Sequence, residues 1–287
     1  MKINPTIGIV GQGFVGGAVY ETLSEYQRIA TYDIHKDKCN TDTLELLIDE
    51  SDIIFVCLPT PMTTTGRCYT GIVEGVLDTI NSYASPGKVI ITKSTVPPGT
   101  HRRWNESYSN LSIVFNPEFL TEANAVQDFR TQRQIILGSD TTEAQLLAKK
   151  AFEFAFPANK VEYISCSYEE AEAIKYFRNT FLSVKISFCN EFYIMCKQMG
   201  IDYDKVSTVA HLDNRLGTSH YKVPGPDGDM GFGGHCFPKD INALINKCQE
   251  LNIDSDMLMA TWKVNEKYRQ NRDWENMPGR AIIKEKT

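Results

Sequence analysis

The chain has 287 residues, enough for roughly two domains, and its 42% hydrophobic and 23% charged residues are typical of soluble globular proteins. Its formal net charge of −6 argues against a general nucleic-acid-binding protein. It has no apolar run long enough for a membrane span and no signal-peptide pattern, so a membrane protein is not expected and a cytoplasmic location is predicted. The eight cysteines form no CxxC pair, so we expect neither a metal site nor a disulfide framework.

A glycine-rich turn follows the first apolar run. Thr6–Val10 predicts a short strand, and Gly11-Gln12-Gly13-Phe14-Val15-Gly16 comes directly after it and opens a helical pattern. In this strand–turn–helix context the motif predicts a dinucleotide-binding fingerprint. Gly11 makes the tight turn, Gly13 lets the pyrophosphate approach the backbone, and Gly16 lets the helix pack on the sheet. The N-terminus of the helix supplies amides for the phosphates.

An acidic residue marks the adenosine end of this predicted site. A second apolar run, Ile29–Tyr32, ends at Asp33, whose carboxylate would hydrogen-bond the ribose hydroxyls and repel a 2′-phosphate. NAD is therefore predicted as the cofactor, although the nearby Lys36 leaves NADP open. The alternative is a glycine turn without a ligand, which the complete motif disfavours.

Apolar runs and helical patterns alternate along the first half of the chain. The further predicted strands are Asp52–Leu58, Lys88–Lys93, Ser112–Phe115, Gln134–Leu137 and Val161–Ile164, and a helix is expected over Thr142–Phe156. This alternation predicts an α/β domain over residues 1–166, a Rossmann-like, doubly wound parallel sheet. Pro59-Thr60-Pro61 opens a loop at the carboxyl end of one strand, where such sheets bind ligands, and the next strand ends in Ser94-Thr95.

Two carboxylates lie four residues apart in the loop Asn116–Glu122. Glu118 and Glu122 could share a helix-like turn and point into one cleft, where their proximity would separate their pKa values. A capping or solvated acidic turn is the commoner outcome for such a pair.

From Ser167 the pattern becomes helical. Ser167 and Glu170 form a capping box, and helix-forming residues continue to Gly200, which predicts a helix of about 30 residues or roughly 45–50 Å. Lys175 and Asn179 lie one turn apart on the same face of this helix. Lys175 either extends to solvent along apolar neighbours, which is the commoner case, or lies in a cleft as part of a functional pair with Asn179.

The rest of the chain predicts an all-helical domain over residues 167–287. Further helices are expected over Asp204–Leu212, Ile241–Gln249 and Asp254–Gln270. The turn-rich insert Val223–Asp229 predicts a mobile flap, and the polar tail Asn271–Thr287 is expected to be frayed.

One cysteine directly follows a glycine-rich turn, in Gly231-Phe232-Gly233-Gly234-His235-Cys236-Phe237-Pro238-Lys239-Asp240. Glycines let a ligand approach the backbone closely, and a nearby lysine favours the thiolate over the thiol. Cys236 is therefore either a nucleophile on an exposed turn or a buried structural thiol, which is the commoner role of a cysteine without a disulfide. The stretch alone favours neither.

Taken together, these motifs resemble the UDP-glucose/GDP-mannose dehydrogenase family from Ile7 to about Tyr268. The resemblance rests on the glycine fingerprint, Lys93-Ser94-Thr95-Val96-Pro97, Asn116-Pro117-Glu118-Phe119-Leu120-x-Glu122, Lys175-x-x-x-Asn179, Arg215-Leu216-Gly217 and the cysteine motif. It implies NAD-dependent oxidation of a sugar's primary alcohol to a carboxylate in two hydride transfers. The implied substrate is UDP-glucose, the implied product is UDP-glucuronate, and the implied context is nucleotide-sugar metabolism and polysaccharide biosynthesis.

The resemblance also implies roles for individual residues. The implied catalytic residues are Cys236 as a nucleophile that forms a thiohemiacetal and then a thioester, Lys175 and Asn179 as donors to the oxyanion, Thr95 and Asp240 as holders of a water, and Glu122, or else Glu118, as the general base. The implied substrate contacts are Glu118, Phe119, Leu120, Lys175, Asn179, Arg215, Tyr221, Phe232, Gly233 and Cys236. The implied cofactor contacts are Gly11, Gly13, Phe14, Val15, Gly16, Asp33, Lys36, Pro59, Thr60, Ser94, Thr95, Glu122 and Lys239. A homodimer through the helical domain is implied as well, with Arg215 reaching across its interface.

The sequence departs from the family pattern in three respects. It lacks the family's Gly-Phe-Ala-Phe-Lys strand, whose lysine contacts the sugar, and its insert Pro224–Asp229 is longer than usual. Members of the family continue into a third domain that binds the nucleotide, and this sequence ends before it, so we expect a shortened form. Three alternatives stay open. The substrate could be another nucleotide sugar, such as GDP-mannose or a UDP-N-acetylhexosamine. The chain could be a single-step β-hydroxyacid dehydrogenase, which does not need the cysteine motif, or a non-catalytic NAD-binding subunit of a partner.

Overall fold

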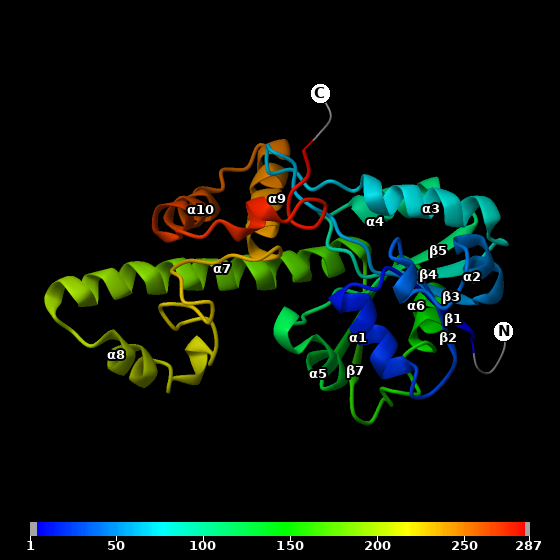
Figure 1. Ribbon diagram of the computed structural model, residues 1–287, viewed down its shortest axis with the longest axis horizontal. Coiled ribbons are helices and arrows are strands. Elements are labelled where there is room, and N and C mark those ends of the chain that lie inside the picture. Colours follow the sequence, from blue (N-terminus) through cyan, green and yellow to red (C-terminus); the bar gives the residue numbers. More distant parts are fainter. Residues whose placement is uncertain (1–4, 285–287) are drawn as a thin grey trace. The chain divides into compact units, whose positions relative to one another are not determined.

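The computed structural model describes residues 5–284, which form two compact units (Figure 1). Unit 1 takes the residues up to Thr60 together with Thr70–Lys175, and unit 2 takes Pro61–Tyr69 together with the residues from Tyr176 onward. The boundary at residues 175 and 176 falls within a long helix, and the short segment Pro61–Tyr69 belongs to unit 2 although the residues on both sides of it belong to unit 1. The predicted domain boundary between residues 166 and 167 stays a prediction, and it differs from the boundary of these units.

Unit 1 is built on a seven-stranded sheet with the strand order β2-β1-β3-β4-β5-β6-β7. The strands are β1 (Ile7–Val10), β2 (Ile29–Tyr32), β3 (Ile53–Val56), β4 (Lys88–Thr92), β5 (Leu111–Phe115), β6 (Gln134–Gly138) and β7 (Glu162–Cys166). Neighbouring strands pair in parallel except β5 and β6, which meet through the antiparallel pair Phe115 and Gly138. The predicted Rossmann-like, doubly wound sheet is confirmed, as a mostly parallel sheet with one antiparallel pair of strands.

The strands form where apolar residues run without interruption, because both faces of the sheet are covered. Every residue of β1 and β3 is buried. Ile53 and Phe55 share one core with Val19 of the first helix, and Ile54 and Val56 on the other face of β3 are equally buried. Each such side chain contributes about 1.5–3 kcal/mol when it is fully buried.

The strands of unit 1 alternate with helices along the chain. The helices are α1 (Phe14–Leu23), α2 (Leu44–Glu50), α3 (Gly71–Tyr83), α4 (Thr100–Ser107), α5 (Ala125–Arg130) and α6 (Thr142–Lys149), with 3-10 turns η1 (Lys36–Lys38) and η2 (Glu122–Asn124). The helix predicted up to Phe156 ends at Lys149, and the turns that follow it place Phe152 and Phe156 in the core.

One unbroken helix, α7 (Tyr168–Met199), belongs to both units (Figure 1). It begins with the predicted capping box, in which the main-chain N–H and Oγ of Ser167 donate to Oε2 of Glu170 at 2.8 and 3.0 Å. It ends before Gly200, whose φ of +68° is the left-handed conformation expected after a helix. Its 32 residues span about 48 Å at a rise of ~1.5 Å per residue.

The other helices of unit 2 follow α7 in the chain. They are α8 (Tyr203–Ala210), α9 (Phe237–Glu250) and α10 (Asp256–Tyr268), with 3-10 turns η3 (Asn214–Leu216) and η4 (Asp273–Asn276). α9 begins at Phe237 rather than at Ile241, because Pro238 fits the first turn of a helix, where no main-chain donor is needed. Among the described residues, none of the helices combines the length and the apolar character of a membrane span.

The insert expected to be a mobile flap is tied to the rest of unit 2. Arg269, which follows α10, pairs through Nη1 with Asp227 of the insert at 2.6 Å. Val223 at the start of the insert is only 5% exposed and packs against Tyr203 and Cys189. The insert is therefore tied to unit 2 at both ends, although residues 224 and 226–228 are exposed, and its mobility stays a prediction.

The tail expected to be frayed is packed up to the last described residues. Trp274 and Ala281 form a buried cluster with Met62 of the segment 61–69. The main-chain N–H of Met62 donates to the Ala281 carbonyl at 2.9 Å, and the Ile283 N–H donates to the Met62 carbonyl at 2.8 Å. The end of the predicted tail, residues 285–287, lies outside the described residues.

Candidate active site

The glycine turn between β1 and α1 has the geometry that a dinucleotide requires. Gly11 has φ +92°, and a Cβ there would lie 2.4 Å from the Cys57 carbonyl oxygen. A Cβ at Gly16 would lie 1.8 Å from the Gly11 carbonyl oxygen, so only glycine allows this close packing. Gly13, the N-cap of α1, has no atom within 4 Å of its Cβ position. The turn therefore leaves room for a phosphate at the N-terminus of α1, and its residues fit the pyrophosphate of NAD.

The carboxylate of Asp33 at the end of β2 is fixed by main-chain amides. Its Oδ2 accepts from the Gln12 N–H at 2.6 Å, and its Oδ1 accepts from the His35 N–H at 2.9 Å. Lys36 donates to the Asp42 carbonyl at 3.0 Å, whereas Lys38 donates to the Gln12 carbonyl of the glycine turn at 3.4 Å. Of the two lysines, Lys38 is therefore the one tied to the glycine turn, and sequence reasoning selected Lys36 because it stands nearer to Asp33.

The loops after β3 and β4 are joined by hydroxyl groups. Oγ1 of Thr60 donates to the Thr95 carbonyl at 2.6 Å, and Oγ of Ser94 donates to the Leu58 carbonyl at 2.7 Å. Thr60, Ser94 and Thr95 are buried, whereas Pro59 is exposed. Unit 1 thus brings these predicted cofactor positions together at the carboxyl edge of its sheet.

A buried charged cluster lies next to these loops in unit 1. Nζ of Lys175 donates to Oε1 of Glu118 at 3.0 Å and to the Glu118 carbonyl at 2.6 Å. Nζ of Lys93 lies 2.5 Å from Oδ1 of Asn116. Lys175 also lies over the ring of Phe119, with Nζ 5.4 Å from the ring centroid. The structure therefore shows Lys175 in a buried ion pair, not extended to solvent as the commoner case would have it.

Burial and charge act in opposite directions on the groups of this cluster. Burial alone would raise the pKa of the Glu118 carboxyl, but Lys175, the Leu120 N–H and Lys93 outweigh it and hold this pKa below its usual range. Burial lowers the pKa of Lys93 to about 8, although Cys57 and Glu118 oppose that shift. Glu118 is therefore a carboxylate, and Lys93 is a cation that can lose its proton near neutral pH.

The two carboxylates of the acidic loop lie in different surroundings. Glu118 is buried in a stretch that is neither helix nor strand, whereas Glu122 is exposed at the start of η2. Residues 116–121 form no helical turn, so the prediction that the two acids share one is wrong.

The cysteine turn of unit 2 leads directly into α9. Cys236 is the N-cap of α9 and is partly buried, and Gly234 two residues earlier has φ +70°. A helix N-terminus favours negative charge, so this is a position at which a thiolate is stabilised. The glycine of the turn is needed because an L side chain rarely adopts that φ.

A buried network lies in the first turn of α9, behind Cys236. Oδ1 of Asp240 lies 2.5 Å from Nζ of Lys239, and its Oδ2 accepts from Nδ2 of Asn179 on α7 at 2.6 Å. Burial alone would lower the pKa of Lys239, but its interactions with Asp240, Cys236 and Cys68 outweigh it and raise this pKa above its ordinary value. Lys239 is thus a fixed cation whose charge acts on Cys236.

The remaining predicted substrate residues of unit 2 are spread over several environments. Arg215, in η3, is 88% exposed and pairs with Asp213. Tyr221 stacks on His211 with ring centroids 3.9 Å apart. The ring of Phe232 is buried in the core of unit 2, and Gly233 lies against the side chains described below. Unit 2 therefore links Asn179, Asp240 and Lys239 directly, with Cys236 at the start of α9. The roles of Arg215, Tyr221 and Phe232 as substrate contacts stay predictions.

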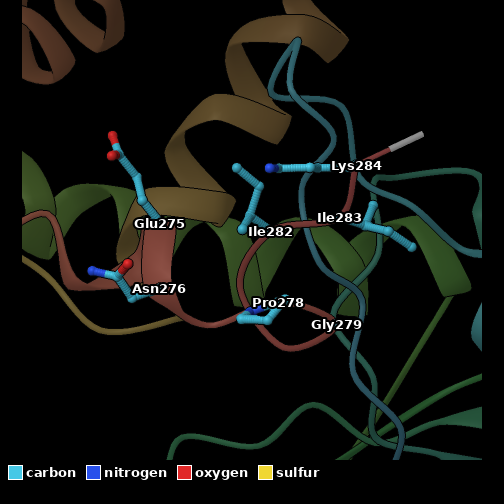
Figure 2. Close-up of a pocket in the computed structure, with 7 residues that line it drawn as sticks. All are labelled: Glu275, Asn276, Pro278, Gly279, Ile282, Ile283 and Lys284. Carbon is cyan, nitrogen blue, oxygen red and sulfur yellow. The ribbon is translucent and has the colours of Figure 1, made fainter. Parts of the chain in front are cut away.

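A pocket of about 480 Å³ lies elsewhere in unit 2 (Figure 2). Its lining comes from the segment after α10: Glu275, Asn276, Pro278, Gly279, Ile282, Ile283 and Lys284. It contains none of the predicted site residues.

Sequence reasoning missed several residues that support the site. Lys93 and Asn116 stand inside the motifs that carry the resemblance, so their position in those motifs was the available signal. No local sequence pattern marks Asn265, Arg269 or Asp273, because each bonds to residues that are distant in sequence.

The fold and the glycine turn define a nucleotide-binding α/β protein of the dehydrogenase type, with a helical second part. Residues 35–155 match the NAD binding domain of the UDP-glucose/GDP-mannose dehydrogenase family, and residues 169–267 match its central domain. The chain belongs to this family of NAD-binding nucleotide-sugar dehydrogenases, and the predicted NAD-binding domain and family resemblance are confirmed.

Individual relatives agree with this assignment. The chain is 33% identical over 237 residues to UDP-glucose 6-dehydrogenase TuaD of Bacillus subtilis (strain 168), which covers 80% of this chain and 49% of that relative. The solved structure of a UDP-glucose dehydrogenase from the hyperthermophilic archaeon Pyrobaculum islandicum is similar at a TM-score of 0.82 and 25% identity, covering 92% of this chain and 68% of that one. The chain spans about half the length of the curated relatives it matches.

One similar structure comes from the alternative class of enzyme. The 3-hydroxyisobutyrate dehydrogenase of Mycobacterium tuberculosis is similar at a TM-score of 0.74 and 16% identity, covering 92% of this chain and 93% of that one. At that identity the similarity concerns the fold alone.

Proposed function

We propose that this chain oxidises UDP-glucose to UDP-glucuronate with NAD, in two successive hydride transfers. The observation that carries the proposal is the position of Cys236 at the N-terminus of α9, with the buried cation Lys239 acting on it. A single-step oxidation of an alcohol has no use for such a thiol, whereas in a double oxidation a nucleophile can hold the intermediate aldehyde. The membership of the family and the UDP-glucose dehydrogenases among the relatives support this substrate.

The glycine turn and the end of β2 would hold the cofactor. Gly13 faces open space for the pyrophosphate, and Asp33 presents a fixed carboxylate for the ribose hydroxyls. Bound NAD supplies the oxidising power by accepting a hydride from the sugar carbon in each of the two steps. The remaining chemistry is the work of this chain's own side chains.

Cys236 is proposed to capture the aldehyde left by the first oxidation. Its Sγ forms a bond to the carbonyl carbon, the π electrons move to the oxygen, and that oxygen takes a proton, which gives a thiohemiacetal. Loss of the carbon-bound hydrogen as hydride and of the hydroxyl proton turns this adduct into a thioester. Water then adds to the thioester carbon, and the C–S bond breaks, which releases the carboxylate and returns the Cys236 thiolate.

Lys175 and Asn179 are the proposed donors to the oxygen that becomes negative in these steps. Lys175 is a buried ammonium held by Glu118, and Asn179 is held by Asp240, so neither side chain has to be ordered during the reaction. Preorganised donors of this kind typically contribute about 3–4 kcal/mol to transition-state stabilisation.

Hydrolysis of the thioester needs a water and a base. Thr95 and Asp240 are proposed to hold the water, and both are buried. Glu122 or Glu118 is proposed as the base. Glu122 is exposed to solvent, whereas the low pKa of Glu118 makes it a weaker base. Replacing each glutamate by glutamine in turn, and measuring the release of the sugar acid, distinguishes the two.

A homodimer through α7 is part of the proposal. Phe177, Phe181 and Phe188 on this helix are 70%, 59% and 63% exposed, and the rings of Phe177 and Phe181 stack at 6.1 Å. Large apolar side chains repeated along one helix are typical of a helix that packs against a partner. A second copy of the chain is the partner that family membership favours.

The test is to count the NADH formed per sugar consumed by the purified chain. UDP-glucose is compared with GDP-mannose and UDP-N-acetylhexosamines. Two NADH per UDP-glucose are expected, and Cys236→Ser should form no acid while it still binds NADH; Cys248→Ser, on the same helix, is the matched control. One NADH per sugar would contradict the double oxidation and favour a single-step dehydrogenase. No NADH with any sugar would favour a non-catalytic subunit.

A further inference from the structure

The glycine turn before Cys236 is held by side chains of distant segments of unit 2. The Phe232 N–H donates to Oδ1 of Asn265 at 2.7 Å, and Nδ2 of Asn265 donates back to the Phe232 carbonyl at 3.0 Å. The Gly231 N–H donates to Oδ1 of Asn190 on α7 at 3.1 Å. The first part of the turn is thus bound to both α10 and α7.

The second part of the turn is held by a carboxylate. The Gly234 N–H donates to Oδ1 and Oδ2 of Asp273 at 3.1 and 3.0 Å. A Cβ at Gly233 would lie 2.2 Å from Nη2 of Arg269 and 2.4 Å from Oδ1 of Asp273, so both side chains touch the backbone there. The amide two residues before Cys236 is therefore fixed by Asp273.

Arg269 connects this carboxylate to the insert. Its side chain is 1% exposed, and its guanidinium lies 2.6 Å from Asp227, 3.7 Å from Asp229 and 3.4 Å from Asp273. Its Nε also donates to the Asn271 carbonyl at 2.7 Å. One buried cation thus pairs with three carboxylates from two segments of the chain, and these pairs depend on each other because they share Arg269.

Asp229 ties the insert to the chain after α10. Its carboxylate accepts from the N–H groups of Asn271 at 2.8 Å, Gln270 at 3.1 Å and Met230 at 2.7 Å. Burial alone would raise the pKa of Asp229, but these amides and Arg269 outweigh it and lower this pKa. The insert is therefore held as an anionic partner of Arg269.

We propose that Arg269, together with Asp227 and Asp229 of the insert, positions Cys236 by fixing the glycine turn through Asp273. The insert then holds in place the turn that carries Cys236. Arg269, Asp227, Asp229 and Asp273 are positioning residues, since they act on Cys236 through the backbone of the turn. The inference rests on the proposed role of Cys236 as the nucleophile.

The experiment measures the alkylation rate of Cys236 by iodoacetamide in the full chain, read from its peptide by mass spectrometry. The double variant Asp227→Asn/Asp229→Asn and the variant Arg269→Lys should each slow it roughly tenfold. The thiolate is the species that reacts, and a thiol that leaves the N-terminus of α9 and the Lys239 cation loses most of its thiolate fraction. The control Arg272→Lys changes an exposed arginine that pairs with Glu275, and its rate should stay within about twofold of the parent. An unchanged rate in the double variant would overturn the inference.

Two further variants separate positioning from simple loss of structure. Asp273→Asn keeps an oxygen that accepts from the Gly234 N–H, whereas Asp273→Ala does not, so the first should retain most of the alkylation rate and the second should lose it. Equal rates in both would contradict the role of Asp273. The side chain of Asp227 is 47% exposed, so Asp227→Asn is expected to fold even if Arg269→Lys does not.

Alkylation needs no sugar, so the outcome separates the two proposals. If Cys236 of the unaltered chain reacts no faster than Cys248, the proposed role of Cys236 as nucleophile fails. If Cys236 reacts fast but equally fast in the variants, only the positioning inference fails. Where turnover is present, the variants should also lower kcat, because they displace the nucleophile.

Discussion

The carboxylate of Glu118 and the ammonium of Lys175 form a buried ion pair, with Oε1 and Nζ 3.0 Å apart and both side chains less than a tenth exposed. Nζ also donates to the carbonyl of the same glutamate at 2.6 Å, so the pair fixes the loop after β5 to the start of α7. Removing one partner of such a pair leaves a buried charge without compensation, which is the costly change.

Lys175→Met should therefore destabilise the protein by about 3–5 kcal/mol, whereas the double variant Lys175→Met/Glu118→Gln should recover much of that loss. Chemical denaturation of the four proteins in a double-mutant cycle measures both. Because the pKa of Glu118 is lower in the folded chain than in the unfolded chain, the unfolded chain is the first to bind a proton at this carboxyl as the pH falls below about 4.3. The contribution of the Glu118 carboxylate to the free energy of unfolding is therefore lost as the pH falls further. Equal destabilisation by the single and double changes would contradict the pairing.

Because Lys93 is buried, we expect its contribution to the free energy of unfolding to rise with pH. Burial lowers its pKa to about 8, so between pH 8 and about 10.4 the unfolded chain binds more protons than the folded chain. The free energy of unfolding of the parent, minus that of Lys93→Met, should increase by about 3 kcal/mol across this window. Urea denaturation at pH 7, 8, 9 and 10 measures the difference. A constant difference would show that Lys93 titrates normally.

Asp33→Asn should weaken NADH binding by roughly 10- to 100-fold, because a charged acceptor for the ribose hydroxyls is lost. NADPH binding should weaken less or improve, since the repulsion of its 2′-phosphate is removed. Fluorescence titration with both cofactors measures the ratio, and Asp37→Asn changes an exposed aspartate of η1 as the control. A ratio of NADH to NADPH affinity that stays at the parent value would contradict the role of Asp33.

The exposed aromatic face of α7 predicts an oligomer that a charge can break. Phe177→Glu and Phe181→Glu each place a carboxylate on this face and should convert the proposed dimer to a monomer, measured by light scattering. Tyr83→Glu changes another exposed aromatic residue, at the end of α3 in unit 1, and should leave the mass unchanged. A parent chain that is already monomeric at working concentration would contradict the dimer.

The parts that could be predicted from the sequence are those whose signals are local. β2 lies where its apolar run predicts it, and the capping box of Ser167 and Glu170 forms as written, because each depends on neighbours in the chain. The start of α9 could be predicted only in part, since Pro238 permits a helix start without requiring one. Asp227 and Arg269 stand 42 positions apart, and nothing in either local pattern predicts that they meet. The same limit explains why the ion pairs of the insert were not expected.

The path of residues 61–69 has a consequence for the order in which the chain folds. This segment lies between β3 and α3, yet its Thr65 carbonyl accepts from Asn246, 181 residues later, and Met62 pairs with Ala281. At roughly 5–20 residues per second, a ribosome needs about 10–40 s to synthesise that interval. During this interval the segment therefore lacks these partners, while later parts of the chain are still being synthesised. Unit 2 can close on this segment only after residue 281 has been synthesised, and a chain interrupted before residue 246 would leave Thr65 and Met62 without these partners.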